Sequence, residues 1–130
     1  MMSPMRSWFC IFLLFAACTP RFEGEVRVDG RVLPITGCRA GQATGFVGVD
    51  LTSADGTKLR LMYQGTAESF AYLFLPGEAV GKQIAICGPM AIERQSSRIN
   101  QVHNHRGHAK LSCTGAGHSI SGEISFENCH

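Results

Sequence analysis

Apolar and polar residues alternate with a period of two through most of this chain, in short runs separated by turn residues. Val26 and Val28 alternate with charged residues, and Asp29-Gly30 then provides a two-residue hairpin turn. Such runs recur at roughly ten-residue spacing, and no window carries a convincing helical stripe. The pattern predicts an all-β fold, a single antiparallel β-sandwich or barrel-like domain.

Three details of the pattern make specific predictions. Gly88-Pro89 interrupts an apolar run and predicts a β-bulge or a corner. Arg106-Gly107 is interpreted as a hairpin turn, and the aromatic residues Phe70, Tyr72 and Phe74 are expected on the core face of one strand. Besides the run at 26–28, the predicted strands are 31–36, 46–51, 57–63, 70–75, 83–87, 90–94, 99–105, 107–113 and 120–126.

The N-terminal segment has the composition of a secretory signal. A lone cation, Arg6, precedes an apolar run from Trp8 to Ala17. This run is too short to span a bilayer, which takes about 20 residues. A cleaved signal peptide is therefore expected, and it implies export to a compartment where disulfides form.

The end of this segment, Leu14-Phe15-Ala16-Ala17-Cys18, resembles the processing site of bacterial lipoproteins. The resemblance implies a diacylglyceryl thioether on Cys18, cleavage just before it, and often acylation of the new amine. Because Thr19 rather than aspartate follows, it also implies the outer membrane as destination in a diderm cell. The expected division is a signal peptide over 1–17, a lipidated tether over 18–24 and a β-domain over 25–130. A plain secretory signal is the alternative.

Four cysteines remain in the domain once Cys10 and Cys18 are assigned to the signal and the anchor. An even number of cysteines in an exported chain predicts two disulfides. Antiparallel neighbouring strands disfavour a bond between Cys113 and Cys129, which leaves two pairings open. Of these, Cys87–Cys129 with Cys38–Cys113 is favoured, because a meander over residues 83–126 would bring these ends together. The four are Cys38, Cys87, Cys113 and Cys129.

All five histidines lie between His103 and His130. With a turn at Arg106-Gly107, the imidazoles of His103, His105 and His108 would share one face of a hairpin. Such a cluster could bind zinc or copper. The simpler interpretation is a polar, solvent-facing strand face, on which Lys110 would repel a dication.

Charge and motifs exclude other functions rather than name one. The 12 Lys and Arg and 10 Asp and Glu are dispersed, without the basic patch of a nucleic-acid-binding protein. Neither a GxSxG elbow nor an HExxH motif occurs. We therefore expect a non-enzymatic envelope lipoprotein with a structural or binding role and no cofactor, whose partner is the bilayer reached through acylated Cys18. A zinc- or copper-binding envelope protein is the alternative, and an envelope enzyme with unrecognised residues a weaker one.

Overall fold

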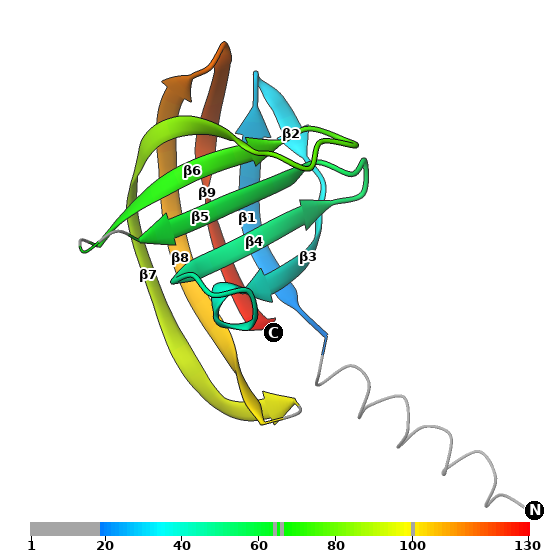
Figure 1. Ribbon diagram of the computed structural model, residues 1–130, viewed down its shortest axis with the longest axis vertical. Coiled ribbons are helices and arrows are strands. Elements are labelled where there is room, and N and C mark those ends of the chain that lie inside the picture. Colours follow the sequence, from blue (N-terminus) through cyan, green and yellow to red (C-terminus); the bar gives the residue numbers. More distant parts are fainter. Residues whose placement is uncertain (1–18, 64, 66, 100) are drawn as a thin grey trace, which may run out of the picture.

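A computed structural model describes residues 19–130 except residues 64, 66 and 100, and this part of the chain is all-β, as predicted (Figure 1). The strands form one antiparallel sheet in the order β2-β1-β9-β8-β7-β6-β5-β4-β3. The elements are β1 (Arg21–Val28), β2 (Arg31–Leu33), β3 (Ile35–Ala40), the 3₁₀ turn η1 (Gly41–Ala43), β4 (Gly48–Ser53), β5 (Lys58–Tyr63), β6 (Glu68–Phe74), β7 (Lys82–Ile99), β8 (Val102–Gly115) and β9 (His118–Cys129).

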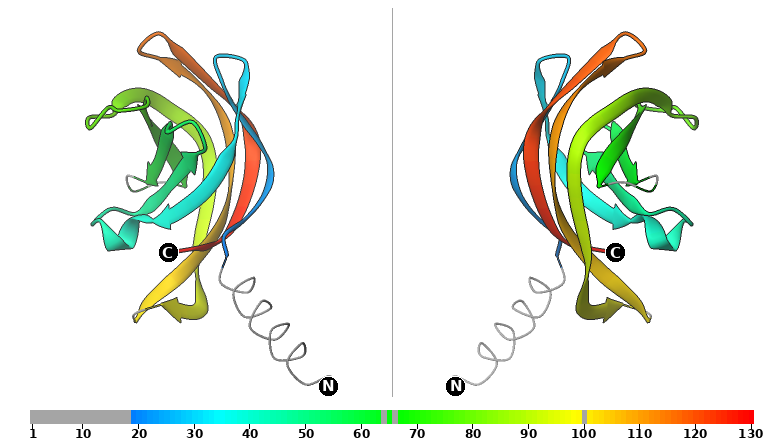
Figure 2. Two further views of the ribbon diagram at one scale, coloured as in Figure 1. Left: turned by 90° about the vertical axis from the view of Figure 1, so that its right-hand side faces the viewer. Right: turned by 90° about the vertical axis from the view of Figure 1, so that its left-hand side faces the viewer.

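The sheet rolls into a nearly closed barrel because its two outermost strands, β2 and β3, are consecutive pieces of chain on either side of Pro34 (Figure 2). Strand β2 pairs with β1, and β3 pairs with β4. At the far end of β3, the Ala40 N–H donates to the carbonyl of His130 at 3.2 Å. The barrel therefore closes where β3 meets the end of β9.

The predicted corner at Gly88-Pro89 is confirmed. Strand β7 runs through these residues, pairs with β6 on one side of them and with β8 on the other, and its register with β6 shifts nearby. Gly88 has φ +119°, and a Cβ there would meet the carbonyl oxygen of Lys110. Glycine permits the bend and proline needs no partner for an amide hydrogen, so one strand serves both halves of the barrel.

The apolar side of each strand fills the barrel. Val26, Leu61, Leu73 and Ile124 are almost completely buried there, as alternation predicts. Among the described residues, every member of the core and of the apolar shell packed on it lies between Phe22 and Cys129. Both disulfides lie in the same range, so residues 19–130 carry a buried core and two cross-links of their own, and we expect them to fold as a domain without the preceding segment.

The predicted turn at Arg106-Gly107 is wrong, because β8 is one continuous strand from Val102 to Gly115. Strand β7 ends at Ile99 and β8 begins at Val102, so the chain reverses between these two residues instead. Gly107 pairs with Phe126 of β9, and a Cβ on it would collide with the Phe126 ring and with the carbonyl of Ala91. This glycine permits close packing inside a sheet, a role that the sequence does not distinguish from a turn.

The aromatic residues of β6 also lie on the other side from the one predicted. Ser69, Ala71 and Leu73 face the core, whereas Phe70, Tyr72 and Phe74 alternate with them on the outer face and are half-buried. Cations on the neighbouring strand β5 cover part of this face: Lys58 Nζ lies 4.1 Å from the centre of the Phe74 ring. Contacts of this kind keep aromatic rings partly desolvated outside a core.

Two disulfides are present, as predicted, but the favoured pairing is wrong. The bonds are Cys38–Cys129, between β3 and β9, and Cys87–Cys113, between the paired strands β7 and β8. The extra hairpin predicted at Arg106-Gly107 reversed the direction of every later strand relative to Cys87. With β8 continuous, Cys87 and Cys113 lie at the same end of neighbouring strands.

The two disulfides should contribute unequally to stability. Cys38–Cys129 joins residues 91 apart in sequence and Cys87–Cys113 residues 26 apart. Chain entropy then predicts about 4–5 kcal/mol for the first and about 3–4 kcal/mol for the second. Urea unfolding of the paired Cys→Ala variants should show the larger loss for Cys38/Cys129. The reverse order would contradict loop closure as the main source of stability.

Candidate functional site

The predicted lipidation site, Cys18, and the signal over residues 1–17 lie outside the described residues. The described chain begins at Thr19, and β1 already begins at Arg21. The strand thus starts four residues before the boundary at residue 25 predicted for the domain. Only Thr19 and Pro20 separate Cys18 from the barrel.

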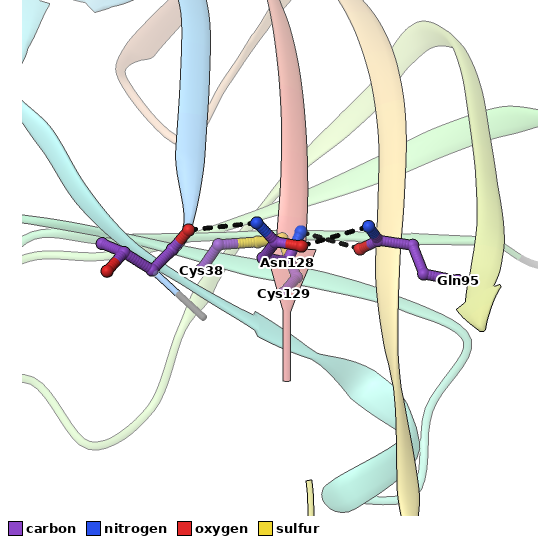
Figure 3. The surroundings of a disulfide bond; sticks show 5 residues. Cys38, Gln95, Asn128 and Cys129 are labelled. Atoms are coloured by element: carbon purple, nitrogen blue, oxygen red, sulfur yellow. Dashed lines mark hydrogen bonds between the residues drawn. A yellow bond between two sulfur atoms is a disulfide. The ribbon is translucent and has the colours of Figure 1, made fainter. Parts of the chain in front are cut away.

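The first described residue is tied to the barrel by a small hydrogen-bond network, which we call the tether clamp: Thr19, Gln95 and Asn128 (Figure 3). Asn128 Nδ2 donates to the Thr19 carbonyl at 3.1 Å. Gln95 Nε2 donates to Asn128 Oδ1 at 3.1 Å, and the Asn128 N–H donates to Gln95 Oε1 at 2.7 Å. The clamp joins the start of β1, the end of β9 and the lower part of β7.

A β-bulge in β9 turns Asn128 toward these partners. His105 of β8 pairs with Cys129 and Gly107 pairs with Phe126, so β9 has one extra residue across this interval. Asn128 has φ +61°, a left-handed conformation that asparagine adopts more readily than most residues. The residue thus fits both the backbone of the bulge and the bidentate contact with Gln95.

The clamp lies beside the closure of the barrel. Cys129 follows Asn128 directly, is fully buried and bonds to Cys38 (Figure 3). His130 contributes on both sides, because its carbonyl accepts from Ala40 at 3.2 Å and its Nε2 donates to the Ile99 carbonyl at 2.8 Å. We call this region, where β3, β7 and β9 are held together, the tether end of the barrel.

The three histidines of the metal hypothesis occur along one strand and not across a hairpin. His103 and His105 share a face of β8, and alternation places His108 on the opposite face. His103 Nδ1 donates to the Gln95 carbonyl at 2.8 Å, and His108 Nε2 contacts Glu123 Oε1 at 2.7 Å.

No group of three or more His, Cys, Asp and Glu side chains suited to a metal ion occurs within the described part of the chain. The shared face predicted for the three imidazoles is therefore wrong. Binding of zinc or copper itself stays a prediction.

An open groove of about 840 Å³ is lined by residues of β1, β9, β8 and β7. Two ion pairs lie along it: Arg21 with Glu127 at 3.6 Å and Arg106 with Glu93 at 2.5 Å. Gly107 and Phe126 also line it. The charges of the groove are thus largely paired with one another, which leaves only a weak net electrostatic field to attract a charged ligand.

Sequence reasoning identified the histidines but missed Gln95 and Asn128. The sequence signal for them was weak, since a polar residue near a strand end is ordinary. Their partnership depends on a bulge and on two strands that lie 33 residues apart in the chain.

We expect Asn128→Ala to lower the free energy of unfolding by about 2–3 kcal/mol. Two side-chain hydrogen bonds account for about 1 kcal/mol each, and the left-handed backbone costs an L-residue with a Cβ about 1 kcal/mol more. Asn128→Gly is the matched control, because it loses the bonds but tolerates the backbone. Urea unfolding should therefore give a higher free energy of unfolding for Asn128→Gly than for Asn128→Ala. Equal free energies for the two variants would mean that the backbone conformation contributes nothing.

His105 should make stability depend on pH. Burial lowers its pKa below the ordinary value of 6.5, and its buried Nδ1 has no hydrogen-bond partner among the described residues. The unfolded chain therefore binds a proton more readily, and this contribution to stability is present above pH 6.5 and lost as the pH falls. Unfolding measured between pH 7.5 and 5 should show a shallower decline for His105→Gln. If the stability of His105→Gln declined as steeply as that of the parent, the pH dependence would come from other groups.

Known proteins add nothing to this geometry: no protein family, curated protein or solved structure matches the chain. Nor does the described part of the chain include a helix long and apolar enough to cross a bilayer. The functional interpretation therefore rests on the chain's own residues, above all those at the tether end.

Proposed function

We propose that this chain is a lipid-anchored, non-enzymatic protein of the bacterial cell envelope, in which Cys18 carries the lipid and the barrel has a structural or binding role. The observation that carries the proposal is the tether clamp. Asn128 holds the carbonyl of Thr19, the residue next to Cys18, at 3.1 Å. A residue beside a flexible linker would not need such a contact, whereas a residue beside a membrane anchor transmits the orientation of the barrel.

The dimensions of the chain support this role. Consecutive Cα atoms are about 3.8 Å apart, so a lipid on Cys18 would lie within a few ångströms of the clamped Thr19. The tether end of the barrel would then sit at the headgroup region. Most of the barrel surface would remain available to a partner in the envelope.

The anchor itself follows simple energetics. Each buried methylene contributes about 0.8 kcal/mol, and stable attachment takes two acyl chains or one chain with a second signal. A diacylated or triacylated Cys18 meets this condition without a membrane-spanning segment. Two disulfides in a domain of this size suit an oxidising compartment outside the cytosol. The outer membrane is the proposed destination, because Thr19 follows the modified cysteine.

Metabolic labelling tests the anchor directly. Cells expressing the full chain with radiolabelled palmitate should yield labelled protein in the membrane fraction, and Cys18→Ser should abolish both the label and the processed form. Cys10→Ser is the matched control, because it removes a thiol from the same segment and should leave labelling intact. An unlabelled protein, with Cys18→Ser processed and located like the parent, would refute the proposal.

A further inference from the structure

Strands β7 and β8 continue past the rest of the barrel as a two-stranded arm, here residues Arg94–His105, whose tip lies at residues 99–102 (Figures 1 and 2). The arm projects at the same end of the barrel as the start of β1. Gln95 of the arm and Thr19 both bond to Asn128, so the arm and the first described residue are held in a fixed relation.

The arm is held at two further points. His130 Nε2 donates to the Ile99 carbonyl at 2.8 Å near the tip, and Asn104 Nδ2 donates to Ser97 Oγ at 3.1 Å between its strands. Asn104 is 2% exposed. The first contact fixes the arm relative to the end of β9 and the second holds its two strands together, so the arm has a defined direction, which is what a docking element requires.

The charged side chains of the arm are all positive. Arg94 and Arg98 are exposed, and the sequence contains no carboxylate between Glu93 and Glu123. His105 and His103 are their direct cross-strand partners. Neither arginine forms a salt bridge within the described residues.

The carboxylates at the base of the arm are already engaged. Glu93 pairs with Arg106 at 2.5 Å, and Glu127 pairs with Arg21 at 3.6 Å. They therefore offset little of the positive potential that Arg94 and Arg98 project. That potential reaches about one Debye length, about 8 Å at physiological salt, so the arm must approach an anionic partner closely.

The tip adds apolar surface to this charge. Ile99 and Val102 are cross-strand partners at the end of the arm and are only partly buried. Exposed Gln101 lies between them in sequence. A short apolar tip beside arginines is suited to the interface of a bilayer, where side-chain stems enter the headgroup region and the charges stay at phosphate level.

We propose that the arm docks on the surface of an anionic phospholipid bilayer, the membrane to which Cys18 is attached; this rests on the proposed lipid anchor. The clamp sets the arm beside the anchored residue, so both reach the same membrane. The lipid keeps the protein at the surface, and the arm fixes which side of the barrel faces it. Attachment through one residue alone would leave that orientation free.

Sedimentation of residues 19–130 with vesicles tests the arm separately from the anchor, because this domain lacks Cys18. The domain should bind vesicles that contain phosphatidylglycerol more tightly than vesicles of phosphatidylcholine alone, and rising salt should release it. Each arginine near an anionic surface is worth about a fivefold change in affinity. Arg94→Gln with Arg98→Gln should therefore weaken binding about 25-fold.

The matched control removes two arginines from the β1–β2 hairpin. Arg27→Gln with Arg31→Gln changes the net charge equally but leaves binding nearly unchanged, since this hairpin projects at the opposite end of the barrel (Figure 2). Thermal unfolding of both variants should match the parent domain, so that a folding defect is recognised as such. A second variant, Ile99→Ser with Val102→Ser, should weaken binding without changing its salt dependence.

Three results would overturn the docking surface: no preference for phosphatidylglycerol, equal losses in the two double-arginine variants, or equally tight arm-dependent binding of a DNA oligonucleotide. The last would assign the arm to nucleic acid. None of these results bears on the proposed lipid anchor, which palmitate labelling tests. Conversely, vesicle binding that depends on Arg94 and Arg98 would support the arm even if Cys18 carried no lipid.

Discussion

The arrangement of the tether end depends on the closure of the barrel between β3 and β9. These strands lie far apart in the sequence, and the Cys38–Cys129 bond, between residues 91 apart, and the Ala40–His130 hydrogen bond hold them together. Without this closure, the last residues of β9, which extend past its pairing with β1 at Glu127, would be held in the sheet by β8 alone. With it, Cys129 is fixed in the core, and the adjacent Asn128 can hold Thr19 and Gln95 at defined positions.

The length and bend of β7 decide what projects from that end. Because Gly88 and Pro89 let the strand turn a corner without ending, β7 pairs with β6 and then continues with β8 beyond the other strands. A strand that ended at the corner would leave no arm. The same bend that wraps the sheet around its core thus also produces the element that we propose to contact the membrane, and the clamp ties the base of that element to Thr19, the first described residue.

The errors in the prediction share a cause, which is that glycine and aromatic residues have more than one use in a sheet. Gly107 looked like a turn but serves the packing of Phe126 across β8 and β9. Reading it as a turn added a hairpin, grouped the histidines on one face and misassigned the disulfides. The aromatic residues of β6 alternate along the strand as predicted, but they face outward. Smaller residues, Ala71 among them, face the interior, while Lys58 covers the Phe74 ring on the outside.

The sequence by itself determined the all-β class, most strand positions, the Asp29-Gly30 turn and the Gly88-Pro89 corner, since alternation and turn chemistry act over a few residues. Even the existence of two disulfides followed from the even number of cysteines left once Cys10 and Cys18 were assigned to the predicted signal and anchor. Only the tertiary structure decided which cysteines pair, which face of β6 is buried, and that Asn128 joins Thr19 to Gln95. These features depend on contacts between strands far apart in the chain, and such contacts are set by the register and closure of the whole sheet.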